Sequence, residues 1–407
     1  MNPKATLVFI YNSFNDPLFQ NLVFSYIVSL SSGTRYTFHI ITFEQQKYYL
    51  SRNKKRELKT NLKTKGIYWY PLTFHTGYLL LLKKIYDFIS AISTVLYIRF
   101  FKKTKLLFAF ANVSAAISVI FSKLLGMRLL VYSYEPHSSF QVELGRWDKR
   151  SIKYKLLKKL EDYAGSQGDY ILTGTKYMVK ELANRKSKAK LFRAPTSVDE
   201  SLYEFNGEAR TRIREELGID RRKVLLYLGK FDGLYYGGEI ADFCKTISDN
   251  DSSFFFLIVT PNNYQKVEGL FKVSGISEEN YYITEAVTPS EVIEYISSSD
   301  IGLIAIPPTP SQKFRSPVKT AEYLLCGLPY ITCEGVSEDD IYAQEYNVGI
   351  VLQNLAKDQA LNSAGRINTL LAEDKNELRK RCREVGLSYR SKSNVVKTLR
   401  EIYAEVF

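Results

Sequence analysis

The sequence predicts an α/β protein with two domains, each built on a parallel β-sheet whose two faces are covered by helices. Short apolar runs alternate with segments of helical periodicity along nearly the whole chain, which is typical of parallel sheets. A length of 407 residues is enough for two cores of ordinary size, and 45% apolar with 24% charged residues is a globular composition. A segment without periodicity near residue 200 divides the chain into two halves.

The first half begins with a strand and continues as a regular alternation of helices and strands. The run LVFIY at 7–11 predicts the first strand, and 16–30 carries apolar residues at helical spacing. A basic stretch, 47–65, separates the second predicted strand from the third. Further predicted strands are 38–43, 67–72, 106–110, 128–134 and 170–172, and further helices are 78–105, 113–125, 151–163 and 176–184.

The predicted helix at 78–105 has an aliphatic and aromatic face and ends in a cluster of three lysines, Lys102, Lys103 and Lys105. Charged residues interrupt it at 83, 84, 87 and 99, so it falls short of a membrane span. Two interpretations remain open. The helix can lie on an anionic membrane surface, or it can pack on its own sheet with solvated lysines.

A linker is expected at 191–205, where LFRAPTSVDESLYEF shows no periodicity. The second half then repeats the alternation of strands and helices, which predicts a second parallel sheet. Its predicted strands are 224–228, 254–259, 281–283, 301–306, 330–333 and 349–352, and its last predicted helix is 394–406.

Charge and cysteine usage limit the partners and the compartment. The net charge of +13 is uneven, with +19 in residues 1–200 and −6 in the remainder. The basic half suits an anionic partner such as nucleic acid, an anionic membrane leaflet or a lipid diphosphate. Because no nucleic-acid motif accompanies the charge, we do not expect nucleic-acid binding. The four cysteines are widely spaced, which suits reduced thiols in a cytosolic protein and predicts no zinc site.

The stretch FRSPVKTAEYLLCGLPYITC, from Phe314 to Cys333, has the pattern of a helix that connects two buried parallel strands. Ser316 is a favoured N-cap, Pro317 suits the first helical position, and Gly327 is favoured just beyond a helix end. The N-terminus of such a helix points free N–H groups into the crevice beyond the strand ends. A phosphate is favoured there by hydrogen bonds and by the helix dipole.

Lys319 and Glu322 allow two interpretations. Lys319 adds a positive charge in the first turn, and the Glu322 carboxylate can accept hydrogen bonds from two adjacent sugar hydroxyls, which suits a ribose joined to a diphosphate. Alternatively, the two side chains form an i,i+3 surface pair worth roughly 0.2–0.5 kcal/mol. The residues alone leave both interpretations open.

The motif Ser-Pro-x-Lys-x-x-Glu-Tyr-Leu, followed by Cys-Gly-Leu-Pro, resembles the donor-binding helix of retaining glycosyltransferases of family 4, which have the GT-B fold. The resemblance implies two Rossmann-like domains facing a cleft. The two domains are an acceptor-binding domain at 1–195 and a nucleotide-sugar-binding domain at 196–390, and a C-terminal helix at 391–407 packs back on the first domain. It also implies that Glu322 holds the donor ribose, and that the helix start, Ser316, Pro317, Val318 and Lys319, holds the diphosphate.

The same resemblance implies roles for residues outside this helix. Gly229 and Lys230 stand where the family has a Gly-Arg pair that binds the donor diphosphate, although Lys230 can also be a solvated loop lysine. His137, which follows the predicted strand at 128–134, resembles the family's histidine beside the donor sugar. The expected catalytic residues are therefore His137, Lys230 and Glu322. Ser13 and Phe14 replace a glycine pair in the loop that contacts the acceptor in many such enzymes, and the resemblance therefore implies that they are the acceptor-binding residues.

The other two histidines are not expected in the site. His39 lies inside a strand pattern and is expected to be structural, and His75 is in a loop with no partner that the sequence identifies.

Two positions depart from the family pattern, and a DxD sequence is not expected to bind a metal ion. Phe314 stands where the family often has a first glutamate, and Tyr236 stands where it has a lysine. The DxD sequence at Asp249–Asp251 falls between a helix and a strand and is expected to be a solvated loop. We therefore expect neither a metal ion nor a cofactor. Lys230, Lys319 and the helix N-terminus would neutralise the leaving diphosphate.

The sequence thus predicts a hexosyltransferase that moves a sugar from a nucleotide sugar to a lipid-linked or other glycan acceptor, with retention of configuration. The basic first half favours a cytoplasmic location at the inner face of a membrane, on an anionic surface. The alternative, motivated by Phe314 and Tyr236, is a non-catalytic subunit of the same fold that binds a partner enzyme or a membrane. The oligomeric state is not predicted.

Overall fold

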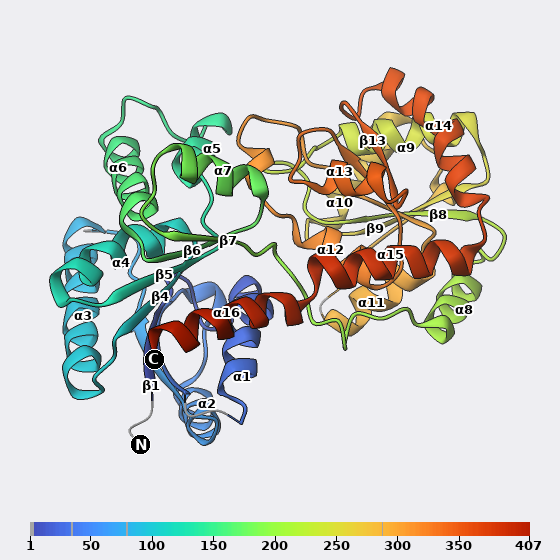
Figure 1. Cartoon of the computed structure of the whole chain (residues 1–407). Coiled ribbons are helices and arrows are strands. Elements are labelled where there is room, and N and C mark those ends of the chain that lie inside the picture. The colour runs from blue at the N-terminus through green and yellow to red at the C-terminus, as the bar shows by residue number, and fades with distance from the viewer. Residues whose placement is uncertain (1–3, 34–35, 79, 287) are drawn as a thin grey trace. The chain divides into compact units, whose positions relative to one another are not determined.

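The structure is a computed structural model that describes residues 4–33, 36–78, 80–286 and 288–407 (Figure 1). It divides into two compact units. The first contains the chain up to Pro195 together with Val395–Phe407, and the second contains Thr196–Asn394. Each unit has one sheet, and every strand pair in both sheets is parallel. The predicted fold class of two parallel-sheet α/β domains is confirmed.

The first unit is built on a seven-stranded sheet with the order β3-β2-β1-β4-β5-β6-β7. Val8 of β1 lies opposite Ile40 of β2 on one side and Phe108 of β4 on the other. The strand order therefore reverses between β1 and β4, where a parallel sheet opens a crevice at its carboxyl ends. The strands are β1 Lys4–Phe9, β2 Tyr36–Glu44, β3 Ile67–Thr73, β4 Leu106–Phe110, β5 Arg128–Tyr132, β6 Tyr170–Thr173 and β7 Lys190–Arg193.

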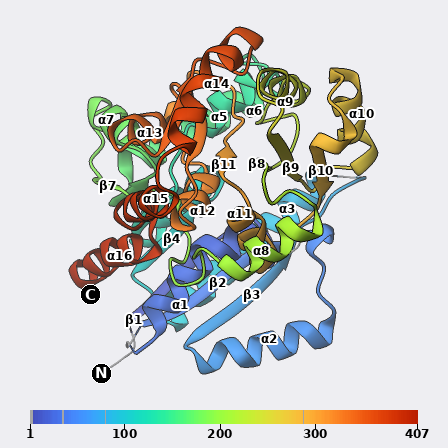
Figure 2. The same ribbon diagram turned by 90° about the vertical axis from the view of Figure 1, so that its right-hand side faces the viewer.

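Helices cover both faces of this sheet, because alternate strand residues point to opposite sides. On one face, Val8 and Phe108 pack in one cluster with residues of α1 and α16. On the other face, the Phe9 ring lies 5.9 Å from the Phe121 ring of α4, and Phe88 of α3 lies 6.5 Å from Phe121. Figure 2 shows α2 running alongside β3. The α-helices of this unit are α1 Ser25–Ser31, α2 Arg52–Thr64, α3 Leu80–Phe101, α4 Ala111–Leu125, α5 His137–Glu143, α6 Ile152–Gln167, α7 Lys176–Asn184 and α16 Lys392–Val406.

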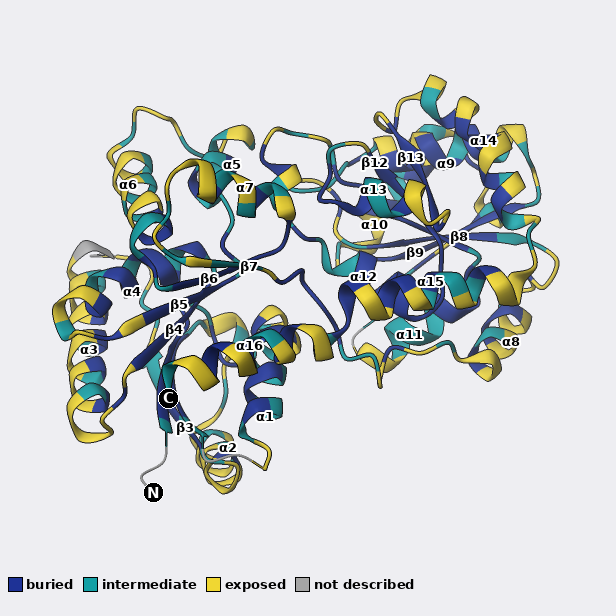
Figure 3. Ribbon diagram, viewed as in Figure 1, coloured by how far each residue is buried: buried dark blue, intermediate teal, exposed yellow. Residues whose placement is uncertain are grey.

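The helix predicted at 78–105 is α3, which is shorter than predicted and ends at Phe101. Residue 79 lies outside the described residues. Ala91, Val95 and Ile98 are buried against the unit, whereas the opposite side of the helix is exposed along its length (Figure 3). None of the helices in the described ranges combines the length and apolar content that a bilayer crossing requires.

The second unit has a six-stranded sheet with the order β10-β9-β8-β11-β12-β13, so its order reverses between β8 and β11. Its strands are β8 Lys223–Leu228, β9 Phe254–Val259, β10 Tyr281–Thr284, β11 Ile301–Leu303, β12 Tyr330–Cys333 and β13 Gly349–Leu352. Its α-helices are α8 Gly207–Glu216, α9 Glu239–Asn250, α10 Tyr264–Ser274, α11 Pro289–Ser298, α12 Val318–Leu325, α13 Asp339–Glu345, α14 Lys357–Leu371 and α15 Lys375–Arg390.

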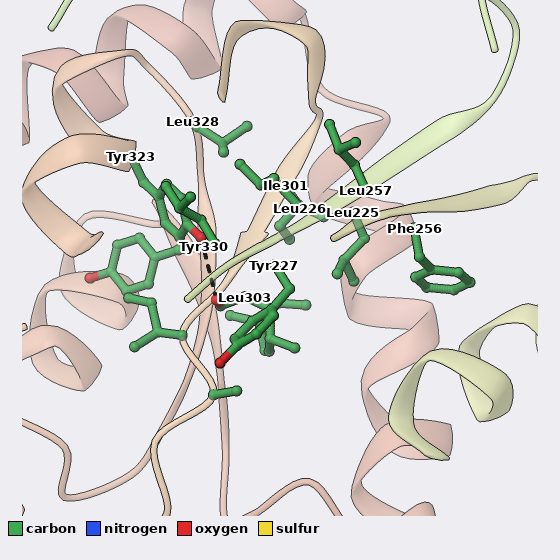
Figure 4. Packing of buried hydrophobic residues seen from close by; sticks show 14 of the residues in the cluster. Leu225, Leu226, Tyr227, Phe256, Leu257, Ile301, Leu303, Tyr323, Leu328 and Tyr330 are labelled. Atoms are coloured by element: carbon green, nitrogen blue, oxygen red, sulfur yellow. Dashed lines mark hydrogen bonds between the residues drawn. The ribbon is translucent and has the colours of Figure 1, made fainter. Parts of the chain in front are cut away.

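The core of the second unit forms around its central strands (Figure 4). Leu225, Leu226 and Tyr227 of β8 are buried, because a central parallel strand is covered on both faces. Tyr323 of α12 is fully buried, and its hydroxyl donates to the carbonyl oxygen of Leu303 at 3.5 Å. Through these contacts α12 packs against β11.

The strand β7 and the helix α5 are among the elements of the first unit that differ from the prediction. The segment predicted as a linker begins with β7, an edge strand whose one neighbour among the described strands is β6. Its residues are half-buried or exposed, so it lacks the apolar run by which the inner strands are recognised. The short helix α5 was also not predicted, because its seven residues are too few to display a helical period.

Candidate functional site

The candidate site of the second unit lies at the carboxyl edge of its sheet, where the strand order reverses between β8 and β11. The loop after β8 carries Gly229 and Lys230, and the segment after β11 leads into α12. The backbone N–H of Tyr236 donates to the carbonyl oxygen of Ala305 at 3.1 Å and ties the two segments together. The start of α12 and Lys230 therefore belong to the same edge of the sheet.

The helix α12 begins at Val318, with Pro317 as its N-cap and no capping side chain. The prediction that Ser316 caps the helix is wrong. The Ser316 Oγ instead accepts a hydrogen bond from the backbone N–H of Thr196 at 3.0 Å and another from the Arg390 guanidinium. The N–H groups of the first helical turn have no partner inside the helix, and so they remain available to an anionic ligand.

A buried polar network lies behind this helix start. Arg390 is 0% exposed and donates to the carbonyl oxygen of Thr196 at 3.1 Å and to the Asp339 carboxylate. The Thr320 hydroxyl of α12 donates to the same carboxylate at 2.6 Å. Burial alone would lower the pKa of Arg390, but the neighbouring Asp339 carboxylate raises that pKa above its ordinary value. The network fixes Ser316 and the first turn of α12 from behind.

Glu322, predicted to hold a ribose, is 5% exposed on α12 and has two donors. Its Oε1 accepts from the Tyr203 hydroxyl at 3.3 Å, and its Oε2 accepts from the Lys319 ammonium at 2.7 Å. The Lys319–Glu322 pair therefore exists, but it is partly buried. Since each carboxylate oxygen can accept two hydrogen bonds, Glu322 keeps the capacity to bind sugar hydroxyls.

A close approach between α12 and β11 sets the position of these residues. A Cβ atom on Gly302 of β11 would lie 2.5 Å from the Tyr323 ring, so only glycine allows the helix to sit this close. On the other side, a Cβ atom on Gly386 of α15 would lie 3.0 Å from the backbone of Leu324. α12 is thus held by two glycine contacts and by the Arg390 network.

Lys230 and Gly229 lie directly after β8. Gly229 donates its N–H to the carbonyl oxygen of Val259 at 3.0 Å, and a Cβ atom there would lie 3.1 Å from the Tyr227 hydroxyl. The Lys230 side chain is exposed, and none of the ion pairs among the described residues involves its ammonium. Lys230 is therefore a cation available to a ligand at this edge.

The two residues that depart from the family pattern are partly buried. Tyr236 packs against the core of the second unit, and this burial raises the pKa of its hydroxyl. Phe314 ends a short 3-10 helix, Gln312–Phe314, and the Lys313 ammonium lies 5.1 Å from the centre of its ring. Neither side chain adds a charge to the candidate site.

The DxD sequence lies at the opposite edge of the sheet, because it precedes the amino end of β9. Asp249 pairs with Lys245, and Asp251 pairs with Lys223 at 2.7 Å. Among the residues that the structure describes, no group of three or more His, Cys, Asp or Glu side chains could hold a metal ion. A cavity of about 320 Å³ also lies at this amino edge, between Phe205, Lys223 and Arg379, and is separate from the start of α12.

In the first unit, Ser13 and Phe14 follow β1 at the reversal of strand order. Ser13 is fully buried, and its Oγ accepts from the N–H of Gln45 at 2.7 Å. Phe14 is 2% exposed and packs 4.7 Å from the ring of Trp69. These side chains anchor the loop in the core, and the expectation that Ser13 and Phe14 bind an acceptor stays a prediction.

His137 is the first residue of α5, just beyond β5, and it is partly buried with its ring 5.8 Å from the ring of Trp147. The buried Glu161 of α6 supports this helix start. Both of its carboxylate oxygens lie 3.2 Å from the N–H of Ser138. Burial raises the pKa of Glu161 to about 7, even though the hydrogen bonds from Ser138 favour the charged form. Glu161 was not predicted, since nothing near it in the sequence marks it as α5's partner.

The other two histidines are engaged within the first unit. His39 is buried and stacks on Tyr68, and its pKa is lowered to about 4 by burial and by Lys102, so it is structural. The sequence identifies no partner for His75, and the structure provides one. Its Nδ1 hydrogen-bonds to the Asp87 carboxylate, which also accepts from Lys84 at 3.2 Å. Asp87 lies about two helical turns inside α3, and nothing in the sequence around His75 predicts this pairing.

No protein-family model matches the chain, and no curated protein sequence matches it either. Solved structures match it along its whole length. HepE of Anabaena in complex with UDP matches with a TM-score of 0.71 at 10% identity, covering 98% of this chain and 100% of HepE. Sucrose-phosphate synthase from Thermosynechococcus elongatus matches with a TM-score of 0.74 at 14% identity, covering 99% of each chain.

WaaG, a glycosyltransferase involved in lipopolysaccharide biosynthesis, matches with a TM-score of 0.66 at 13% identity, covering 98% of this chain and 99% of WaaG. At such identities the likeness concerns the fold. With its two parallel α/β units and full coverage of these structures, the chain has the two-domain GT-B fold of glycosyltransferases.

Proposed function

We propose that the chain is a glycosyltransferase that takes a sugar from a nucleotide-sugar donor. The observation that carries this proposal is the start of α12. There, uncapped N–H groups, the Lys319–Glu322 pair and the unpaired Lys230 belong to one sheet edge at a reversal of strand order. The proposal is also supported by structures of the same fold that hold UDP, UDP with glucose, or UDP-glucose.

Each chemical group of the donor is assigned to residues at this edge of the sheet. The diphosphate lies against the N–H groups of Val318 and Lys319, with Gly229 permitting close approach and Lys230 supplying charge. Glu322 accepts hydrogen bonds from the ribose hydroxyls. Ser316 and Pro317 act by setting where the helix begins, because the Ser316 hydroxyl is already engaged by Thr196 and Arg390.

In the proposed reaction, the bond between the sugar and the diphosphate breaks, the acceptor oxygen bonds to the same face of the sugar, and the hydroxyl proton passes to the departing phosphate oxygen. Configuration is then retained without a carboxylate nucleophile. Lys230, Lys319 and the helix N-terminus stabilise the charge that develops on the leaving diphosphate, and no metal ion or cofactor is proposed. His137 is assigned to the donor sugar on the basis of the family resemblance, and a hexosyl group is the sugar we propose.

The proposed acceptor is a lipid-linked or other glycan in polysaccharide or glycoconjugate biosynthesis. We propose that the enzyme works as a peripheral protein at the cytoplasmic face of an anionic membrane. The net charge of +19 in residues 1–200 supports this location, because anionic headgroups attract clustered lysines and arginines.

The test is sugar transfer by the purified chain. It is incubated with UDP-, GDP-, ADP- and CMP-activated sugars and a membrane lipid extract, and the glycosylated lipid is detected by mass spectrometry. Glu322→Gln is expected to lower the rate at least tenfold, since one hydrogen bond to a charged group is worth about 1.5–3 kcal/mol. The matched control is Glu384→Gln, an exposed change on α15 that should leave the rate unaltered.

Two results would redirect the proposal. A product whose anomeric configuration, measured by NMR, is inverted would refute retention while leaving sugar transfer intact. Absence of transfer from every donor, together with no binding of any nucleotide, would favour the second candidate. That candidate is a non-catalytic binding subunit, and the uncharged Tyr236 and Phe314 beside the site are the observations that favour it.

A further inference from the structure

The outward side of α3 is apolar along almost its whole length. Residues 82–101 are all described, and eleven of their side chains are exposed. The only polar one is Ser93. The other ten are apolar or aromatic: Leu82, Ile85, Tyr86, Phe88, Ile89, Ile92, Leu96, Tyr97, Phe100 and Phe101. The four charged residues of this range, Lys83, Lys84, Asp87 and Arg99, are all buried or half-buried.

The spacing of these residues forms a continuous stripe. Leu82, Ile85, Ile89, Leu96 and Phe100 follow one another at intervals of three, four or seven residues, which places them on one side of a helix. At 1.5 Å per residue, the stripe from Leu82 to Phe100 is roughly 27 Å long. The opposite side of α3 already packs on the sheet. A surface helix that is apolar on both sides needs a partner for its outer side.

Positive charge gathers at the C-terminal end of the stripe. Lys102, Lys103 and Lys105 are exposed just beyond the end of α3. The Nε of Arg99 donates to the carbonyl oxygen of Leu125 at 3.0 Å, so the exposed end of α4, with Lys123 and Leu124, lies beside the end of α3. The one acidic residue between 78 and 128 is Asp87, which is 4% exposed and already paired with His75 and Lys84.

We propose that the outer face of α3 docks on a lipid bilayer with anionic headgroups, with the helix lying in the plane of the membrane surface. The apolar stripe would enter the boundary between headgroups and acyl chains, and the lysines at its C-terminal end would contact the headgroups. Charge decides between this occupant and a second copy of the chain. Two copies would bring the same lysines together with no exposed carboxylate of α3 to neutralise them.

The proposal makes the membrane location of the proposed function specific, but it does not depend on sugar transfer. A chain that binds no nucleotide can still bind vesicles through α3, and a nucleotide-binding chain can fail to bind them. Membrane docking through α3 and sugar transfer can therefore be refuted independently of each other.

The test is co-sedimentation of the full chain with vesicles of phosphatidylcholine, with and without phosphatidylglycerol. Binding is expected to the anionic vesicles, and added salt should weaken it as it screens the headgroups. The triple variant Leu82→Ser, Ile89→Ser, Phe100→Ser should bind on the order of 100-fold more weakly, because each change removes a large apolar group from the interface. Its matched control is Leu202→Ser, Val273→Ser, Leu361→Ser, three exposed apolar residues of the second unit.

A second pair of variants tests the charge. Lys102→Gln, Lys103→Gln, Lys105→Gln should weaken binding on the order of 100-fold, at about fivefold for each lysine near the surface. Lys357→Gln, Lys375→Gln, Lys380→Gln changes the net charge equally on exposed residues of the second unit and should leave binding unaltered. Circular dichroism melts of every variant separate lost binding from lost folding.

Three results would overturn the proposal. The folded wild type could fail to sediment with anionic vesicles at low salt, or the α3 variants could bind as well as their controls. Alternatively, analytical ultracentrifugation could give a dimer that the serine variant of α3 dissociates, while vesicles bind no protein. That result would assign the stripe to a second copy of the chain.

Discussion

At the scale of single residues, each unit buries charged side chains that are held by specific partners. Arg390 and Asp339 pair in the second unit behind the start of α12, and Glu161 accepts the N–H of Ser138 at the start of α5 in the first. A buried charge is costly unless it is paired or hydrogen-bonded. These positions are therefore where single substitutions have large and predictable effects.

Glu161 predicts a specific pH dependence of stability. Its folded-state pKa of about 7 lies above the ordinary value of 4.5, so between these values the folded chain binds more protons than the unfolded chain. The contribution of protonated Glu161 to the stability of the folded chain is fully present below about pH 4.5 and is lost as the pH rises to about 7. Glu161→Gln should thus gain about 3 kcal/mol relative to wild type between pH 4.5 and 8 in urea unfolding. A difference that stays constant with pH would refute this role of Glu161.

The Arg390–Asp339 pair predicts a large loss when one partner is removed. Arg390→Met leaves the Asp339 carboxylate uncompensated and should lower the free energy of unfolding by about 3–5 kcal/mol, measured in urea. The matched control is Lys266→Met, which removes the exposed partner of Asp232 and should cost about 0–1 kcal/mol. Equal losses in the two variants would contradict the account of the network.

At the scale of the element, α12 is placed by contacts that the local sequence does not reveal. The apolar runs of β8, β9 and β12 and the helix-ending Gly327 were predictable, because burial and left-handed backbone geometry restrict which residues fit. Ser316 looked like an N-cap, and its hydroxyl is instead taken by Thr196 and Arg390. Thr196 and Arg390 lie more than 70 residues from Ser316, so only the fold brings them together.

The contact between β11 and α12 can be tested through Gly302. In Gly302→Ala the new Cβ atom would lie 2.5 Å from the buried Tyr323 ring, which should cost about 1–3 kcal/mol in urea unfolding. Adding Tyr323→Leu should recover part of that loss, since it removes the ring atoms that clash. Gly365→Ala is the control, because this helical glycine has nothing within 4 Å and alanine should stabilise α14 by about 0.5–1 kcal/mol. A neutral Gly302→Ala would show that α12 can shift freely.

At the scale of the whole molecule, the first unit is completed by the far end of the chain. Val395, Leu399 and Tyr403 of α16 are buried in the same cluster as Val8 and Phe38. The fold class could be predicted from the alternation of strands and helices. Three features could not be predicted from the sequence. The buried partners of the histidines and the Arg390 network depend on contacts between distant segments. The strand β7 has no apolar run by which it could be recognised.

This arrangement predicts that the last helix stabilises the first unit. Leu399→Ala removes a fully buried side chain and should lower the free energy of unfolding by about 2–5 kcal/mol. Lys397→Ala, an exposed change on the same helix, should stay within about 0.5 kcal/mol of wild type. Urea unfolding, followed by a fluorophore attached to the first unit, measures both. Equal stabilities would mean that α16 contributes little to this core.

The proposed function depends on nucleotide binding at the start of α12. The most direct test is thermal unfolding of the chain in the presence of UDP, GDP, ADP or CMP. A nucleotide at about 100 times its dissociation constant stabilises the folded chain by roughly 2.7 kcal/mol and moves the midpoint by several degrees. We predict that one nucleotide shifts wild type and Glu384→Gln equally, and that Glu322→Gln loses half of the shift or more, since an affinity at least tenfold weaker leaves the nucleotide at no more than about ten times its dissociation constant. A panel in which no nucleotide shifts wild type, or in which Glu322→Gln shifts as wild type does, would contradict the account.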